Sequence, residues 1–204
     1  MIVLGLTGSI GMGKSTAASM LRRLRVPVSD ADAIVHDLLG RGGAAVESVS
    51  SAFPEVVVNG AVDRVALGTQ IFGDVAALTL LESILHPLVA EARDRFLRES
   101  RRVRIPVVAL DIPLLFEVEA DALCHATIVI SAPNFIQAGR VLSRPNMSRG
   151  KLNDILARQM SDREKRRRAT FVVSSAAGRR VTLQALARIV KLARRGRLPP
   201  TRRS

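Results

Sequence analysis

A glycine-rich loop directly after the N-terminal apolar run constrains the fold more than any other feature. Residues 2–6 have the composition of a short buried strand, and residues 8–15 then have the spacing G-x-x-x-x-G-K-S before a helix-forming stretch. This pattern is typical of a loop in which Gly8, Gly11 and Gly13 let backbone N–H groups surround phosphate oxygens at the start of a helix. We expect Lys14 to reach the β- and γ-phosphates of a nucleoside triphosphate and the Ser15 hydroxyl to ligate Mg²⁺.

Four further short apolar runs, rich in β-branched residues and mostly bounded by Pro, Gly or charged residues, have the composition of strands. They span residues 26–29, 105–111, 126–130 and 170–174. Helical patterns separate them, at residues 17–24, 31–39, 44–52, 76–85, 88–98, 135–142, 151–160 and 183–193. Because buried strands alternate with helices, the sequence predicts an α/β fold with a five-stranded parallel sheet covered by helices on both faces.

The spacing of these elements predicts a P-loop core interrupted by an insertion. Residues 42–104 contain several helical patterns and no convincing strand, so we expect a helical insertion that binds the acceptor substrate. The core then consists of residues 1–41 and 105–195, and residues 134–160 form a helical lid within it. We expect the Arg-rich segment 196–204 to be a disordered basic tail.

The formal net charge of +13 suggests an anionic partner. The chain has neither Trp nor Tyr, however, so it lacks the aromatic platforms on which single-stranded nucleic acids stack. We therefore interpret most of the charge, including the run at residues 163–168, as solvated helix faces, with a subset directed at a polyphosphate substrate. The sequence argues against a nucleic-acid partner.

The single cysteine bears on the compartment in which the chain works. Cys124 excludes an internal disulfide and fits a reducing environment, and we interpret it as a packing residue. No apolar run approaches the roughly 20 residues needed to cross a bilayer, and the N-terminus has no signal-peptide pattern. We expect a cytoplasmic protein without membrane contact, a monomer or small homo-oligomer that acts on a small molecule.

Carboxylates follow two of the predicted strands, where ligands of open parallel sheets bind. Asp30 is placed to cap the helix that begins near residue 31, which leaves Asp32 to face the phosphates, orient an acceptor hydroxyl and accept its proton. Alternatively, both are only helix-start residues. Asp111 ends the third strand and is expected to act on Mg²⁺ through water. Glu117 is either a helix-start residue or a substrate contact.

Three polar residues share one face of the helix predicted at residues 135–142 and its extension. Gln137, Arg140 and Arg144 lie at i, i+3 and i+7, and a short loop leads to a second helix. A helix pair with arginines on one face is typical of a mobile lid that neutralises charge on a transferring phosphoryl group. The alternative interpretation is an ordinary solvated face.

The three histidines carry weaker information. His86 precedes Pro87 between two helical patterns, so we expect a bend there, with His86 more typical of a hydrogen-bonded structural residue than of a base. His36 and His125 have no spacing that indicates metal ligation.

An ordered set of motifs resembles the dephospho-coenzyme A kinase family. The resemblance covers about residues 2–192, and its spacing is far more specific than the phosphate loop alone. The motifs occur in this order: the loop at residues 6–16, Asp30-Ala31-Asp32, Leu85-His86-Pro87, residues 113–117 (PLLFE), Gln137 with Arg140 and Arg144, and Gln159-Met160.

This resemblance implies an ATP-dependent phosphorylation of the ribose 3′-hydroxyl of dephospho-CoA, the last step of coenzyme A biosynthesis. It implies a P-loop kinase core with a helical CoA-binding domain and a lid. It also assigns residues: those from Gly11 to Thr16, including Met12, hold ATP and Mg²⁺, and Asp32 is the base. Arg140 and Arg144 are the lid arginines, and His86, Pro113 and Leu114 lie near the acceptor.

The chain departs from the family pattern at three places. Pro145 stands where the family usually has Asp, Thr170 where it often has Asp, and Ser174-Ser175 where it has Asn near the end of the last strand. These departures bear on the adenine contacts and the lid. Two other functions stay open: a P-loop kinase for another small molecule or a nucleoside monophosphate, and a non-enzymatic nucleotide-binding module that binds RNA through its basic surface.

Overall fold

A computed structural model of the chain describes residues 1–199, so residues 200–204 of the predicted basic tail lie outside the described residues. The chain divides into two compact units, one formed by residues 1–29 and the segment from Val103 onward, the other by Asp30–Arg102. The sequence predicts the first boundary at residue 42. The contacts place it earlier, because the helix at residues 31–39 packs against the long helix of the second unit.

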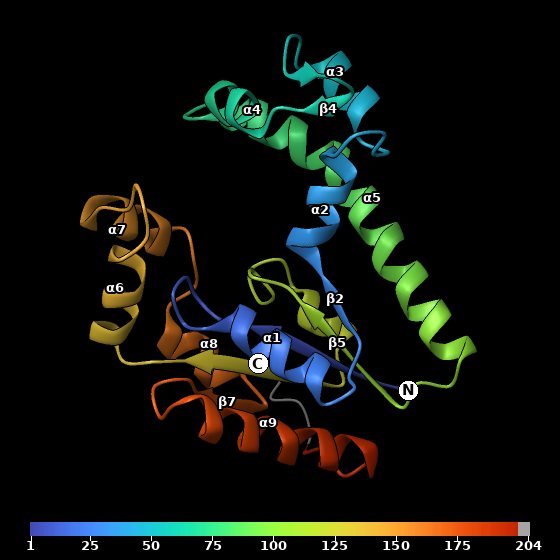
Figure 1. Ribbon diagram of the computed structural model, residues 1–204, viewed down its shortest axis with the longest axis vertical. Coiled ribbons are helices and arrows are strands. Elements are labelled where there is room, and N and C mark those ends of the chain that lie inside the picture. The colour runs from blue at the N-terminus through green and yellow to red at the C-terminus, as the bar shows by residue number, and fades with distance from the viewer. Residues whose placement is uncertain (200–204) are drawn as a thin grey trace. The chain divides into compact units, whose positions relative to one another are not determined.

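The first unit is built on the five-stranded sheet that the sequence predicts (Figure 1). The strand order is β2-β5-β1-β6-β7, and β1 pairs in parallel with both β5 and β6, as β6 does with β7. The strands are β1 (Ile2–Thr7), β2 (Val28–Asp30), β5 (Val107–Asp111), β6 (Ala126–Ser131) and β7 (Phe171–Ser174). The central strands are continuous apolar runs because helices cover both of their faces.

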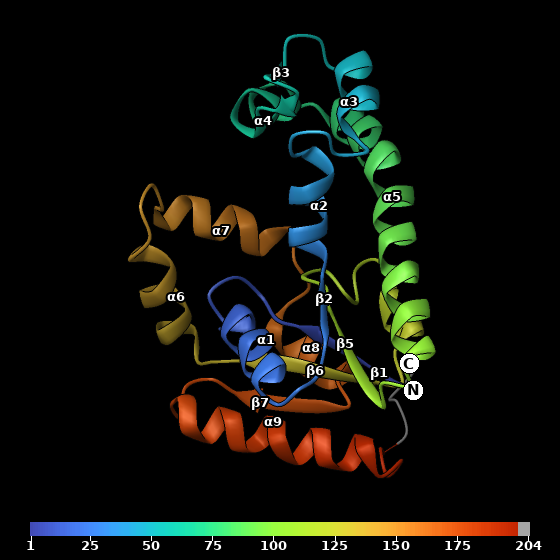
Figure 2. The ribbon, with the colours of Figure 1, turned by 45° about the vertical axis from the view of Figure 1, so that its right-hand side comes forward.

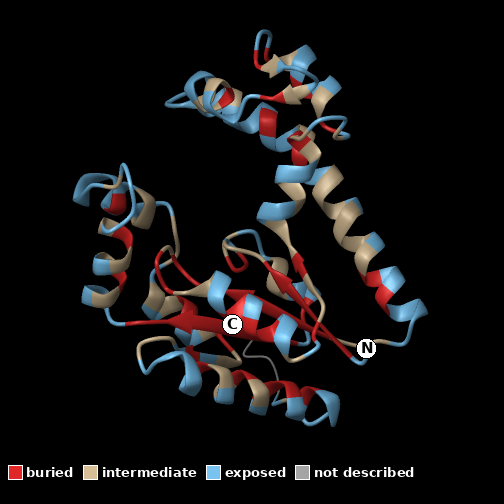
Figure 3. Cartoon of the chain, viewed as in Figure 1, coloured by how far each residue is buried: buried red, intermediate tan, exposed pale blue. Residues whose placement is uncertain are grey.

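Alternation along β6 separates the two faces of the sheet. Ile128 and Ile130 pack with α1 (Lys14–Arg23) and α9 (Arg179–Arg194), whereas Val129 packs with Phe116 and Ala169 on the other face, where α8 (Asp162–Arg168) contacts β6. Figure 2 shows α9 running along the sheet, and Figure 3 shows the strands as the most buried part of this unit. The remaining helices of this unit are α6 (Asn134–Leu142), α7 (Arg149–Ala157) and the 3₁₀ helix η1 (Ala120–Leu123).

Shortening Leu4 should destabilise this unit strongly. Leu4 lies in the central strand β1 and is fully buried, so Leu4→Ala removes packed methyl groups and leaves a cavity. We expect a loss of about 2–5 kcal/mol in the free energy of unfolding, measured by urea denaturation. The matched control is Val172→Ala on the edge strand β7, where 45% of the residue is exposed and the change should stay within about 0.5 kcal/mol. Equal losses in both variants would contradict this view of the core.

The second unit has a core of its own. Leu39, Val49, Phe53, Leu67 and Leu85 are among its buried residues. All but Phe53, which directly follows α3, come from the four helices of this unit. These are α2 (Ala31–Leu39), α3 (Val46–Ala52), α4 (Arg64–Ile71) and α5 (Val75–Arg102).

Two expectations for the second unit are wrong. The unit contains a small antiparallel hairpin, β3 (Val57–Val58) and β4 (Ala61–Val62), whose two-residue turn Asn59-Gly60 has positive φ at both positions. Asn-Gly favours this turn. The two helical patterns expected on either side of His86 also form a single helix, because α5 continues through Pro87. Ile84 and Leu88 on either side of Pro87 pack into the same core, which compensates for one missing backbone hydrogen bond.

Helix α5 is the one described helix that is long and apolar enough to cross a membrane. It has 28 residues, and the mean hydropathy of its most apolar window is 1.4, although Glu82 and His86 interrupt any continuous apolar run. This test uses length and composition only. Leu81 and Leu85 of the same helix belong to the packed core of the second unit, although only 11% of the apolar window is buried.

Candidate functional site

The loop between β1 and α1 has a backbone that only glycine adopts readily. Gly11 and Gly13 have φ values of +75° and +91°, and a Cβ on Gly11 would lie 2.5 Å from a methyl group of Val141. Gly13 is the N-cap of α1 and makes no side-chain cap bond, so the N–H groups of the first turn are directed at the loop. Met12 is buried and its Sδ accepts from the backbone N of Ala132 at 3.1 Å. Any contact of Met12 with phosphate is therefore made by its backbone.

Lys14 and Asp111 form an ion pair at the carboxyl edge of the sheet. The Lys14 Nζ lies 2.7 Å from Asp111 Oδ1, and the side chains are 14% and 1% exposed. The pair forms because β5 lies beside β1, with Asp111 opposite Leu6. Ser15 and Thr16 follow in the exposed first turn of α1. A carboxylate and a hydroxyl suit Mg²⁺, which takes oxygen ligands and usually completes its shell with water and substrate phosphates. Within residues 1–199, no three His, Cys, Asp or Glu side chains gather as a metal site.

Arg140 is held against the phosphate loop by a residue that the sequence analysis did not assign a role. Its Nη1 donates to Ser175 Oγ at 2.8 Å and its Nη2 donates to the Ser175 carbonyl at 3.0 Å. The Ser175 hydroxyl in turn donates to the Met12 carbonyl at 2.7 Å. Ser175 directly follows β7, so its place at the carboxyl edge of the sheet was the available clue.

A cavity of about 330 Å³ lies beside this contact. It brings Arg140 together with Arg144, and it adds Arg179 from the start of α9, a residue that no sequence motif indicates. Gly11, Gly13 and Thr16 of the phosphate loop line the same cavity. The arrangement can bind a polyanion because three guanidinium groups and a helix N-terminus meet there.

Gln137 and Gln159 both form hydrogen bonds with the backbone of Ile10 in the phosphate loop. Gln137 Nε2 donates to the Ile10 carbonyl at 2.8 Å, and Gln159 Oε1 accepts from the Ile10 backbone N at 3.2 Å. Gln137 lies on α6 and Gln159 follows α7, so both ends of the predicted lid are joined to the phosphate loop.

The segment 113–117 follows β5 at the same edge of the sheet. The Pro113 carbonyl accepts from Thr7 Oγ1 at 2.9 Å, Leu114 is 37% exposed, and Leu115 is fully buried. Glu117 is a structural link, because its Oε1 accepts from the Met160 backbone N at 2.8 Å and pairs with Lys165.

Asp32 and His86 lie in the second unit. The Asp30 side chain accepts from the Ala33 backbone N at 3.3 Å, which confirms that Asp30 caps α2. Asp32 lies exposed in the first turn of α2, and His86 lies exposed on α5. Their roles at the acceptor stay predictions. His36 contacts Arg64 through Nδ1 at 3.1 Å, and nothing in that contact indicates a metal.

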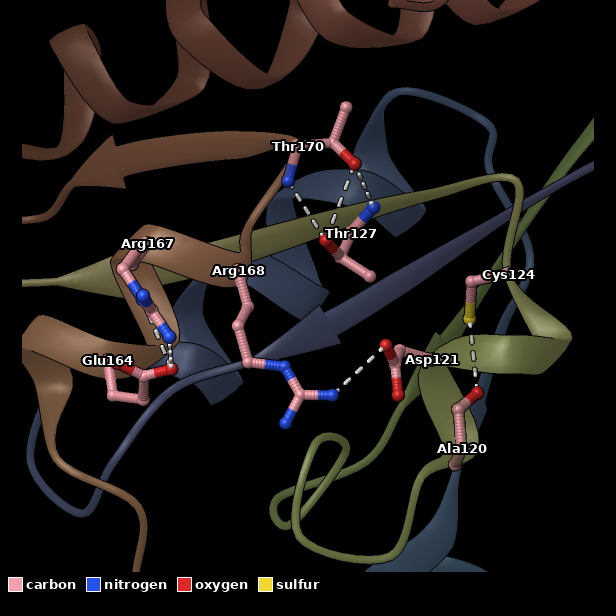
Figure 4. Close-up of polar contacts among 8 residues, drawn as sticks. All are labelled: Ala120, Asp121, Cys124, Thr127, Glu164, Arg167, Arg168 and Thr170. Carbon is pink, nitrogen blue, oxygen red and sulfur yellow. Dashed lines mark hydrogen bonds and ion pairs between the residues drawn. The ribbon is translucent and has the colours of Figure 1, made fainter. Parts of the chain in front are cut away.

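Thr170, one of the departures from the family pattern, lies away from this edge of the sheet. Thr127 Oγ1 accepts from the Thr170 backbone N at 3.0 Å, and Thr170 Oγ1 accepts from the Thr127 backbone N at 3.1 Å (Figure 4). Thr127 and Thr170 lie at the amino ends of β6 and β7. The Thr170 side chain therefore links two strands and does not contact the phosphate loop at the carboxyl edge of the sheet.

Helix α8 ends two residues before Thr170 and is strongly basic in its last turn. Figure 4 shows Arg167 paired with Glu164, which raises the pKa of Arg167 first through the hydrogen bond and then through its charge. Arg168 pairs with Asp121 at 3.5 Å and lies over the Phe116 ring, 4.9 Å from its centroid. These basic side chains therefore support the fold or face solvent.

The hydroxyl of Ser175 can be tested by Ser175→Ala. The substitution removes an acceptor of Arg140 and a donor to the phosphate loop, and a hydrogen bond to a charged group contributes about 1.5–3 kcal/mol. We expect ATP binding to weaken about tenfold, measured by titration with the nucleotide. Ser51→Ala in the second unit, whose hydroxyl bonds only the Glu47 carbonyl, serves as control. Unchanged ATP binding in Ser175→Ala would show that Arg140 needs no such support.

The fold and this edge of the sheet define the class of the protein. A glycine loop between β1 and α1, a lysine paired with the carboxylate that ends β5, and arginines beside the loop are the parts of a P-loop kinase. The model of the dephospho-CoA kinase family matches residues 2–179. The chain belongs to the dephospho-CoA kinase family.

Individual relatives agree along nearly the whole chain. The dephospho-CoA kinase of Paramagnetospirillum magneticum is 61% identical over 81% of this chain and 78% of its own length. That of Rhodospirillum rubrum is 51% identical over 96% and 93%. The crystal structure of TT1252 from Thermus thermophilus has a TM-score of 0.79 and 37% identity, covering 93% of this chain and 96% of that one. The dephospho-CoA kinase from Campylobacter jejuni shares the fold, with a TM-score of 0.62 and 22% identity over 94% and 96%.

Proposed function

We propose that the chain transfers the γ-phosphoryl group of ATP to the ribose 3′-hydroxyl of dephospho-CoA, giving coenzyme A and ADP in the last step of coenzyme A biosynthesis. The observation that carries the proposal is the family match over residues 2–179, which includes both the phosphate loop and the second unit. Relatives with this name match over more than three quarters of their own length.

The phosphate loop and the basic cavity beside it are proposed to hold ATP. Backbone N–H groups from Gly8 to Thr16 surround the phosphates, and Lys14 stabilises the charge that develops on the transferring group. Lys14 is already held at this edge of the sheet by its contact with Asp111. Arg140 and Arg144 bind further phosphate oxygens, and closure of residues 134–160 excludes water.

Ser15 and Asp111 are proposed to hold Mg²⁺, since their oxygen atoms fit its preference. Bound Mg²⁺ would neutralise charge on the β- and γ-phosphates. Asp111, which is 1% exposed and paired with Lys14, is proposed to act on this ion through water.

Asp32 is proposed to orient the acceptor hydroxyl and accept its proton. His86, Pro113 and Leu114 are proposed to contact dephospho-CoA, and the insertion at residues 42–104 to bind the rest of it. We propose a cytoplasmic enzyme that acts as a monomer or small homo-oligomer, without a nucleic-acid or membrane partner.

A comparison of acceptors tests this function. The purified chain is incubated with ATP and Mg²⁺, and ADP release is measured with dephospho-CoA, AMP, CMP and shikimate in parallel. Release only with dephospho-CoA is expected. Release only with another acceptor would keep a P-loop kinase but overturn the substrate. No release with any acceptor would favour a nucleotide-binding module, whose RNA binding can then be measured directly.

A further inference from the structure

One buried cation takes no part in the phosphate chemistry described above. Lys165 lies in the basic helix α8, where its neighbours Arg166 and Arg167 are exposed, yet the Lys165 side chain is 0% exposed. Its Nζ lies 2.9 Å from Glu117 Oε1 and donates to the Pro113 carbonyl at 3.3 Å. A buried ammonium is costly unless it is paired and hydrogen-bonded, and these two contacts meet that requirement.

The carbonyl that Lys165 binds belongs to the loop proposed to meet the acceptor. The same Pro113 oxygen accepts from Thr7 Oγ1 at 2.9 Å, and Thr7 is the last residue of β1 before the phosphate loop. Lys165 and Thr7 therefore hold one carbonyl oxygen between them. The start of the acceptor loop is tied to the start of the phosphate loop by this shared atom.

Glu117 extends the contact to the end of the lid. Glu117 Oε1 also accepts from the Met160 backbone N at 2.8 Å. The preceding residue, Gln159, accepts from the Ile10 backbone N in the middle of the phosphate loop. These contacts run from Thr7 through Pro113, Lys165 and Glu117 to the segment Gln159-Met160, and from there to Ile10. The backbone from Thr7 to Ile10 closes the ring, which lies entirely within the first unit.

We propose that Lys165 is a positioning residue that keeps the acceptor loop at residues 113–117 and the lid end at Gln159 and Met160 in register with the phosphate loop. Its ammonium is the only member of the ring, among the residues described above, that contacts both Pro113 and Glu117. Lys165 is too deeply buried to touch a substrate, so it acts through these two partners. The inference rests on the proposed function, because it requires an acceptor at Pro113 and Leu114.

The first variant is Lys165→Met, with Arg167→Met on the same helix as the matched control. Arg167 is exposed and pairs with Glu164, outside the ring. Misplacement of reacting groups by about 1 Å lowers turnover by about 10²-fold, so we expect a kcat loss of that order in Lys165→Met. The KM for dephospho-CoA should rise more than the KM for ATP, because the acceptor loop loses its direct contact. Arg167→Met should keep both parameters.

The second variant separates positioning from charge balance. Lys165→Met leaves the partly buried Glu117 carboxylate without its cation, which by itself destabilises a fold. The double variant Lys165→Met with Glu117→Gln removes that charge and keeps an acceptor for the Met160 N–H. We expect the double variant to regain thermal stability while its turnover with dephospho-CoA stays low.

Several outcomes would overturn the inference. Recovery of turnover together with stability would show that Lys165 only balances the charge of Glu117. Failure of both variants to fold would make Lys165 a residue of stability alone. Wild-type turnover in Lys165→Met, alongside an active parent chain, would reject the positioning role and leave the proposed function intact. An inactive parent chain would reject the proposed function and this inference with it.

Discussion

Replacing Lys14 with alanine should lower turnover with dephospho-CoA by at least about 10²–10³-fold, the usual loss when one preorganised charged contact to a transition state is removed. The Lys14 side chain is 14% exposed, and its ammonium is held by Asp111 at the carboxyl edge of the sheet. The effect is measured as kcat at saturating ATP and acceptor, on protein whose circular dichroism matches the parent chain.

Lys191→Ala is the matched control for this loss. Lys191 lies exposed on α9, in the last turns of a helix that carries other basic residues. Its removal changes the net charge by the same amount, so the two variants have equal net charge. Comparable kcat losses in both variants would mean that Lys14 acts only through net charge, and would contradict its assignment to the phosphates.

Asp32→Asn should lower turnover by a similar factor of at least about 10²–10³ if Asp32 orients the acceptor hydroxyl and accepts its proton. Asparagine has the same shape as aspartate and is also tolerated in the first turn of α2. The substitution therefore changes mainly the charge and basicity of the side chain. Loss of a favourable helix-dipole interaction should cost only about 0.3–1 kcal/mol of stability. The assay measures kcat and both KM values on folded protein.

Asp37→Asn on the same helix controls for the change of charge, since Asp37 is exposed near the C-terminal end of α2. Near-parent turnover in Asp32→Asn would show that the base assignment is wrong and that Asp32, like Asp30, only serves the start of α2. A loss in both variants would point to the stability of α2.

The parts of the fold that follow from local pattern were predictable. The central strands β5 and β6 are short, mostly apolar runs rich in Val and Ile, so their burial on both faces was visible in the sequence itself. Gly11 and Gly13 predicted the positive-φ backbone that a phosphate loop needs. Asp30 predicted the N-cap of α2. The hairpin at Asn59-Gly60 was also visible in principle, but its strands have only two residues each, too few for an alternating pattern.

The contacts that join distant segments were not predictable. Ser175 reaches the phosphate loop across 163 residues of sequence, and no spacing rule relates serine after a last strand to an arginine on α6. Lys165 lies in a run whose composition predicts a solvated basic face. That prediction is wrong for the Lys165 side chain, because it is buried against Glu117 and the Pro113 carbonyl. The continuous α5 likewise depends on core packing that compensates for Pro87.

The most direct test of the central claim is the identity of the product formed from dephospho-CoA. The chain is incubated with ATP, Mg²⁺ and dephospho-CoA, and the nucleotide product is analysed by mass spectrometry before and after treatment with a 3′-nucleotidase. We predict a product heavier by one phosphoryl group that the nucleotidase converts back to dephospho-CoA. Unchanged dephospho-CoA, or a phosphoryl group that the nucleotidase does not remove, would contradict the account.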